Sequence, residues 1–171
     1  MKLTAKQARM IDYLTKLNDK PRLEVYKARI AKREADKAAR RSVRSQAAAE
    51  AAALVKVGDV FEASWGYDQT NVDFFQVVAK TGKSVRIKQV EPTLICEKSI
   101  GPMAAHRTYD IPSDGTMLPV SCCSVFIKDQ ENGDLKRIVS WNGNTYIKLS
   151  SFCTARLAKT GAVEHYESWY A

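Results

Sequence analysis

The sequence predicts an α+β protein, in which a basic N-terminal helical arm is followed by a small antiparallel β-barrel or curved sheet. Three observations predict this class. The net charge is confined to the first third of the chain, the same third has helical spacing of its apolar and basic residues, and the remainder has strand patterns separated by hairpin turns.

The charge distribution divides the chain in two. Residues 1–54 contain 14 Lys and Arg against six Asp and Glu, whereas residues 55–171 contain 13 of each sign. The whole net charge of +8 therefore belongs to the first segment. We expect a basic helical arm over 1–54 and a neutral β domain over 55–171. A charge concentrated in this way is typical of a surface that meets a polyanion.

The first helix is predicted over residues 4–17. Thr4 and Gln7 have the spacing of a capping box, in which each side chain accepts a hydrogen bond from the other residue's backbone N–H. A single apolar stripe follows at steps of three and four residues. It consists of Leu3, Met10, Ile11, Leu14 and Leu17. Residues 18–21 predict a break, because Pro21 disfavours helical dihedrals in the residue before it.

A second, long helix is predicted from Pro21 to Ala53. Proline suits the first turn of a helix, and neither glycine nor proline follows until Gly58. Basic residues recur along it at helical steps, so they share one face. They are Arg29, Arg33, Lys37, Arg40, Arg41 and Arg44. Because its apolar side thins to alanine, we expect this helix to lie outside a core, exposed or along a partner.

The chain after Val57 has the pattern of short strands. Lys80–Lys83 and Asn142–Asn144 are glycine-bearing turns of the kind that join hairpin strands. Five or six strands at these intervals favour an antiparallel barrel or a strongly curved sheet. The expected strand segments are one starting at 57–61, then 71–79, 84–90, 118–127, 138–141 and 145–149.

Composition excludes several classes of protein. No apolar run is long enough to span a membrane, and residues 1–6 lack the apolar core of a secretory signal, so we expect a cytoplasmic protein. The four cysteines have no Cys-x-x-Cys spacing, and adjacent Cys122 and Cys123 would point to opposite faces of a strand. We therefore expect free thiols, with neither a metal nor a cofactor.

An aromatic and polar segment, Ser64–Asn71, joins two of the predicted strands. Trp65, Tyr67 and Gln69 are candidates for stacking on bases or docking on a peptide. The alternative is a structural loop in which Gly66 turns the chain and Trp65 closes the end of the barrel.

The run SWGYDQTNVDFFQVV at residues 64–78, followed by Thr81–Val85 and the C-terminal Ser168-Trp169-Tyr170-Ala171, resembles a family of small uncharacterised bacteriophage and mobile-element proteins. The resemblance covers roughly residues 56–90 and the last four. It implies a viral or mobile-element origin and a host bacterial cytoplasm. It brings no catalytic residue with it.

Function is predicted from the basic face, because none of the common catalytic motifs is present. Gly82-Lys83-Ser84 lacks the upstream glycine and the following helix of a phosphate-binding loop. We expect a non-enzymatic, phage-encoded accessory protein that binds DNA or RNA through the six basic residues. Two alternatives remain open. One is an anti-defence inhibitor that docks on an acidic host protein, in the manner of an anti-CRISPR protein, and the other is a structural or assembly component of a phage particle.

Overall fold

A computed structural model describes residues 3–113, 117–120 and 125–169. Two compact units make up the chain, Met1–Ser45 and Gln46–Ala171. The charge change is at Leu54, whereas the compact units divide at Ser45. The difference arises because Ala48, Ala51 and Ala52, near the end of the second helix, are buried within the second unit.

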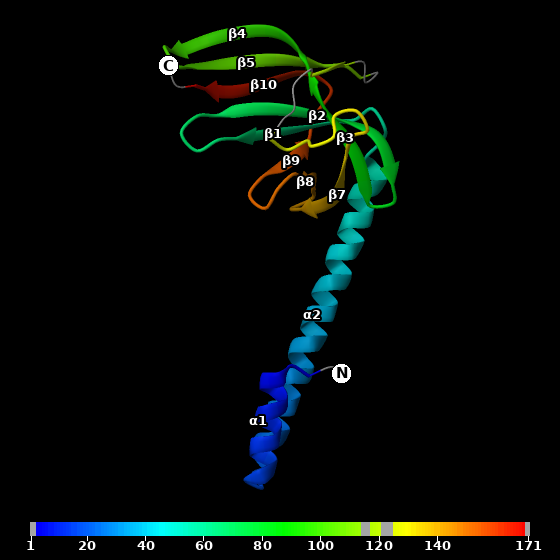
Figure 1. The fold of residues 1–171 in the computed structure, drawn as a ribbon, viewed down its shortest axis with the longest axis vertical. Coiled ribbons are helices and arrows are strands. Elements are labelled where there is room, and N and C mark those ends of the chain that lie inside the picture. Colours follow the sequence, from blue (N-terminus) through cyan, green and yellow to red (C-terminus); the bar gives the residue numbers. More distant parts are fainter. Residues whose placement is uncertain (1–2, 114–116, 121–124, 170–171) are drawn as a thin grey trace. The chain divides into compact units, whose positions relative to one another are not determined.

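The first unit consists of helix α1, Ala5–Lys16, and most of helix α2, Lys20–Leu54 (Figure 1). The predicted capping box is confirmed. The backbone N–H of Gln7 donates to Thr4 Oγ1 over 3.3 Å, and the backbone N–H of Thr4 donates to Gln7 Oε1 over 2.7 Å. These two bonds satisfy N–H groups that the first helical turn leaves without partners.

The predicted break between the helices is also confirmed. Asn18 takes a positive φ of 52°, a conformation that asparagine tolerates better than most residues. Asp19 then caps α2, since its Oδ1 accepts the backbone N–H of Arg22 over 3.2 Å. Leu14 and Ile30 are the buried apolar side chains of this unit within its described residues.

The last turn of α2 is anchored within the second unit. The Lys80 ammonium donates to the carbonyl oxygens of Ala52 and Val55 over 2.5 and 2.7 Å. A cation at a helix C-terminus satisfies carbonyls that have no helical partner, and it complements the helix dipole. The expectation that this helix lies outside a core is wrong for its last turns, because Ala51 and Ala52 belong to the hydrophobic core of the second unit.

The second unit is built on a closed six-stranded antiparallel barrel, which confirms the predicted fold class. The barrel strands are β1 Val60–Trp65, β2 Asn71–Thr81, β3 Ser84–Glu91, β7 Asp134–Trp141, β8 Asn144–Lys148 and β9 Thr154–Leu157. Neighbouring strands pair in the order β2-β1-β9-β8-β7-β3, and β3 pairs again with β2 to close the ring (Figure 1).

Both predicted hairpin turns are present. Gly82, between β2 and β3, has a φ of 57°. Asn142 and Gly143, between β7 and β8, have φ values of 49° and 76°. Consecutive positive φ angles match the twist of the flanking strands, and this is why Asn-Gly is favoured there.

Successive side chains of a strand point to opposite faces, so the barrel strands contribute to two separate apolar cores. Phe61 and Ala63 of β1 and Phe75 of β2 belong to the core inside the barrel. Val60 and Phe74 point to the other side and form a second core. A three-stranded antiparallel sheet covers this side; it contributes Ile111 to the second core, and its Tyr109 and Val163 pack against that core. Its order is β10-β5-β4, with β4 Thr93–Gly101, β5 Ala104–Ile111 and β10 Gly161–Ser168.

The prediction of a strand over 118–127 is wrong for most of the segment that the structure describes. β6 is Leu118–Pro119, paired with β3, and residues 125–127 are not strand. Phe126 and Ile127 are instead buried in the barrel core, where the Phe126 ring meets Trp65 edge-on. The apolar pattern of this run reports burial, and burial does not require that the residues pair as a strand.

Neither helix of the described chain combines the length and apolar character that a membrane-spanning segment requires.

Candidate nucleic-acid interface

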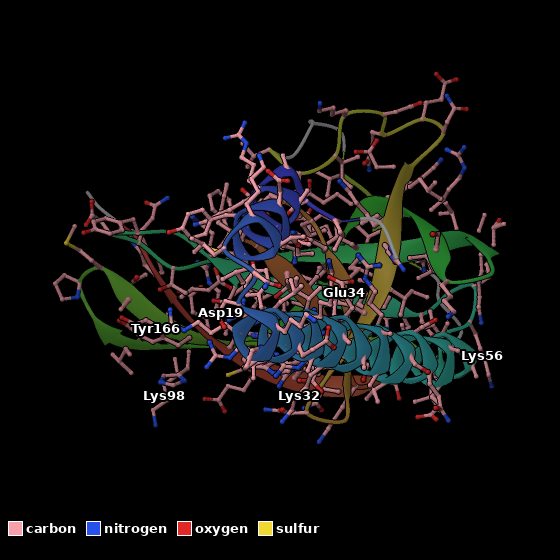
Figure 2. All side chains as sticks on the ribbon, turned by 90° about the horizontal axis from the view of Figure 1, so that it is seen from below. Asp19, Lys32, Glu34, Lys56, Lys98 and Tyr166 are labelled. Atoms are coloured by element: carbon pink, nitrogen blue, oxygen red, sulfur yellow. The ribbon has the colours of Figure 1, made fainter. Side chains whose placement is uncertain are left out.

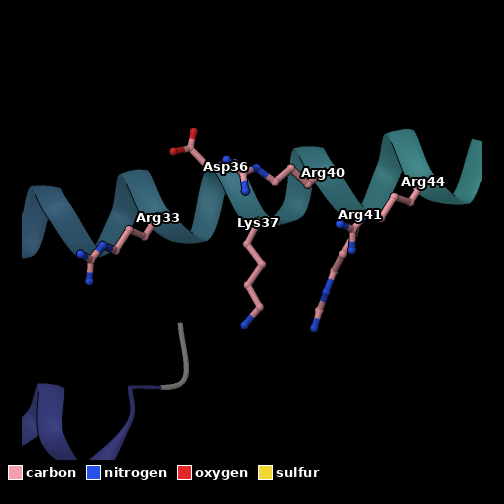
Figure 3. Close-up of a pocket in the computed structure, with 6 residues that line it drawn as sticks. All are labelled: Arg33, Asp36, Lys37, Arg40, Arg41 and Arg44. Atoms are coloured by element: carbon pink, nitrogen blue, oxygen red, sulfur yellow. The ribbon is translucent and has the colours of Figure 1, made fainter. Parts of the chain in front are cut away.

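Five of the six predicted basic residues line one shallow groove of about 400 Å³ on α2 (Figure 3). We call this feature the basic groove. Asp36 is the acidic residue among its lining side chains. In Figure 3, Lys37 and Arg41 extend away from the helix on one side, and the Asp36 carboxylate lies on the other. The basic members are Arg33, Lys37, Arg40, Arg41 and Arg44.

The local sequence explains this alignment. Steps of three and four residues return a side chain to the same helical face, because a turn contains 3.6 residues. Alanine at positions 31, 35, 38 and 39 favours the helix and adds little bulk beside the long basic side chains.

The basic charges of the groove are not neutralised by ion pairs within the described residues. The ion pairs of this unit join Lys16 to Asp12, Arg22 to Asp19 and Lys27 to Glu24, and all involve other side chains. Every residue from Ala31 to Ser45 is exposed. The groove therefore presents five solvated positive charges beside one carboxylate, Asp36, and this net positive charge attracts an anion at little desolvation cost.

Arg29 lies outside the basic groove. With Lys6 and Arg33 it lines a neighbouring cavity of about 310 Å³, in which residues of both helices meet. Arg33 is common to the two cavities, so Lys6 extends the positive surface. Sequence reasoning missed Lys6, because only the packing of α1 beside α2 brings it there, and no local pattern signals it.

The segment Ser64–Asn71, which we call the aromatic loop, belongs to the second unit, and its two aromatic rings have different roles. The Trp65 indole N–H donates to Asp73 Oδ2 over 2.7 Å, and the ring packs against the barrel core. Tyr67, in contrast, is fully exposed, with 100% of its surface accessible. Trp65 is therefore a structural residue, whereas Tyr67 is free to meet a partner.

The backbone of this loop is strongly constrained. Gly66 has a φ of 127°, and a Cβ atom there would lie 1.8 Å from the carbonyl oxygen of Gln69. Gln69 is exposed, and its side-chain amide donates to Asn71 Oδ1 over 3.3 Å. Thr70 and Ser168 exchange backbone hydrogen bonds of 3.0 and 3.1 Å. Tyr67 is thus carried by a loop that is anchored on both sides.

A cluster of charged residues lies between the barrel and the three-stranded sheet, and sequence analysis missed it. Glu62 of β1 is 5% exposed, and it pairs with Arg156 of β9 and with His165 of β10, the latter over 3.1 Å. Burial opposes ionisation of Glu62, but the contact with His165 and the hydrogen bonds from Arg156 outweigh it, so the pKa of Glu62 is lowered.

A second carboxylate of the cluster, Glu167 of β10, is also buried. It accepts a hydrogen bond from the Tyr109 hydroxyl, and it pairs with Arg107 over 3.0 Å. Burial, together with the bond to Glu167, raises the pKa of Tyr109. The sequence did carry a signal for this cluster: charged residues occupy strand positions whose side chains, by the alternation of strand faces, point toward the buried side of the sheet.

The cysteine prediction is tested only in part. Cys96 is exposed and Cys153 is buried, and both are free thiols. Cys122 and Cys123 lie outside the described residues. Across the described ranges, no group of three or more His, Cys, Asp or Glu residues is arranged to hold a metal ion.

Comparisons with known protein families, with curated proteins and with solved structures find no match to this chain.

Proposed function

We propose that this protein binds nucleic acid through the basic groove and does not catalyse a reaction. The observation that carries the proposal is the alignment of five exposed basic side chains along one helical face, none of them in an ion pair with a described residue. Arginine and lysine at such spacing contact successive phosphates, and release of the condensed counterions drives binding.

The setting is proposed on separate grounds. The resemblance of residues 64–78 to bacteriophage and mobile-element proteins supports a phage-encoded accessory protein acting in the bacterial cytoplasm. The absence of a nucleophile–base motif from the sequence supports a binding role.

The direct test measures binding of labelled nucleic acid by fluorescence anisotropy at several salt concentrations. Replacing Arg33, Lys37, Arg40 and Arg44 by Gln removes four contacts and retains good helix formers. We expect the slope of log K against log salt to fall by about three to four in magnitude. Circular dichroism checks that the helix persists.

A matched variant separates the groove from overall charge. Replacing Lys16, Lys20, Lys27 and Lys32 by Gln removes the same number of positive charges outside the basic groove. We expect this control to keep most of the affinity and the salt slope. Equal losses in the two variants would contradict a localised site.

An acidic protein surface would also respond to these substitutions, because Coulomb attraction does not distinguish the two anions. Competition separates them. Free nucleic acid at comparable phosphate concentration displaces a nucleic-acid ligand, whereas displacement by polyglutamate alone would favour the protein partner.

A further inference from the structure

The stretch of α2 that carries the basic groove is exposed along its whole length, from Ala31 to Ser45. Within the first unit, α1 approaches it at Arg33, which lines a cavity together with Lys6. Fifteen helical residues extend about 22 Å. Four of them are alanine and two are serine, which keeps the helix thin between its long basic side chains.

This stretch lacks the groups that proteins use to hold single strands. Binding of single-stranded nucleic acid relies on aromatic rings on which successive bases stack. No Phe, Trp, Tyr or His occurs between Ala31 and Ser45. In the same unit, Tyr26 is half-buried where the two helices meet, and Tyr13 of α1 is exposed but does not line the basic groove. The chemistry of the groove therefore fits a ligand that is recognised by its phosphates and its shape.

Helix dimensions distinguish the two kinds of duplex. An α-helix with side chains is about 10–12 Å across, and the major groove of B-form DNA is about 12 Å wide. The major groove of A-form RNA is too deep and narrow for such entry. The dimensions of an exposed, basic helix therefore match the major groove of B-form DNA and not that of double-stranded RNA.

We propose that the basic groove binds double-stranded DNA, with the Arg33–Arg44 stretch of α2 lying in the major groove. This inference rests on the proposed function. Lys37 and Arg41 extend from the same side of α2 (Figure 3), so both can reach the phosphates of one wall of the major groove. Glu34 and Lys32 point to opposite sides of α2, and neither lines the basic groove (Figure 2).

The first experiment compares three labelled ligands of equal phosphate content: duplex DNA, duplex RNA of the same sequence, and oligo-dT. The full-length protein should bind duplex DNA at least about tenfold more tightly than the other two ligands. This factor is small beside the preferences that DNA-binding proteins show for specific over non-specific ligands. Equal or tighter binding of duplex RNA or oligo-dT would overturn the inference and leave nucleic-acid binding standing. Binding of none of the three would overturn the proposed function itself.

The second experiment tests which DNA groove is used. A duplex whose cytosines carry glucosylated hydroxymethyl groups fills the major groove, whereas netropsin fills the minor groove of an A·T-rich site. We expect the glucosylated duplex to lose about tenfold or more in affinity and netropsin to change binding less than about twofold. The reverse pattern would place the protein on the minor groove and overturn the proposal. The lysine-to-glutamine control variant should show the same pattern as the natural chain.

Discussion

Single residues of the aromatic loop have separable roles, since Trp65 contacts the core and Tyr67 contacts only solvent. Trp65→Ala should lower the free energy of unfolding by about 3–5 kcal/mol, because it removes a large packed ring. Tyr67→Ala should change it by less than about 0.5 kcal/mol. Denaturant titration measures both. A larger stability loss for Tyr67→Ala would show that the roles are reversed.

Gly66 is a position where only glycine fits. Gly66→Ala should be destabilising, because φ is positive and the new Cβ would overlap the carbonyl of Gln69. Gly82→Ala is the matched control: its φ is also positive, but a Cβ there meets no atom within 4 Å. Thermal melts should therefore show the larger loss for Gly66→Ala. Equal losses would mean that φ alone, and not the close approach to Gln69, sets the cost.

Acid stability reports on the buried carboxylate of Glu62. Its pKa is lower in the folded than in the unfolded state. The corresponding stability is therefore present above the ordinary glutamate pKa of about 4.3 and is lost as pH falls through the folded-state value. Glu62→Gln should be destabilising at pH 7, and the difference from the natural chain should shrink in acid.

Asp73 provides a control, because its pKa is shifted in the opposite direction to that of Glu62. Burial raises its pKa, and Glu167 adds to this effect, although the bond from Trp65 opposes it. A raised carboxylate pKa favours folding in acid and costs stability at higher pH. The stability of Asp73→Asn relative to the natural chain should therefore improve as pH rises. Urea titrations between pH 3 and 7 measure both variants, and parallel pH profiles would contradict these assignments.

At the scale of the element, the basic groove is a property of one helix and not of one residue. Each single alanine substitution of its five basic residues should reduce the salt slope by about one, without changing sequence preference. Lys32→Ala, on the same helix but outside the groove, is the control. A slope unchanged in all five variants would show that the groove does not contact phosphates.

The C-terminal end of α2 is stabilised by one side chain, that of Lys80. Lys80→Met keeps the aliphatic stem but removes both hydrogen bonds to the last helical carbonyls. We expect a stability loss of about 1–3 kcal/mol, as for hydrogen bonds to a charged group. Lys159→Met, at an exposed residue of the same unit, should cost little. Near-native stability of Lys80→Met would mean that water replaces the ammonium without cost.

At the scale of the whole molecule, the division into two units predicts the behaviour of truncations. Residues 46–171 should fold cooperatively and should not bind DNA, because the basic groove is removed. A shorter 55–171 chain should be less stable, since it lacks Ala48, Ala51 and Ala52, which are buried in this unit. Denaturation midpoints compare the two fragments, and full DNA affinity in either would contradict the assignment of binding to α2.

The sequence by itself determined those features that depend on short-range rules. The capping box at Thr4, the break near Asn18, the long helix and the two glycine-bearing hairpins each follow from local backbone preferences. The alignment of the basic residues followed as well, because a helix converts sequence spacing directly into a face.

Tertiary structure decided what depends on distant segments. The pairing of β10 with β5, the Glu62–His165 pair and the Tyr109–Glu167 contact join residues that are 50 or more positions apart in the chain. The same is true of Lys6, which joins the basic surface only by packing of α1 beside α2, and of Phe126, whose apolar run fills the barrel instead of pairing as a strand. The alternation of apolar and polar residues along a strand indicates which face of the sheet is buried, but it does not indicate which segment packs on that face. Long-range packing alone therefore fixed these contacts.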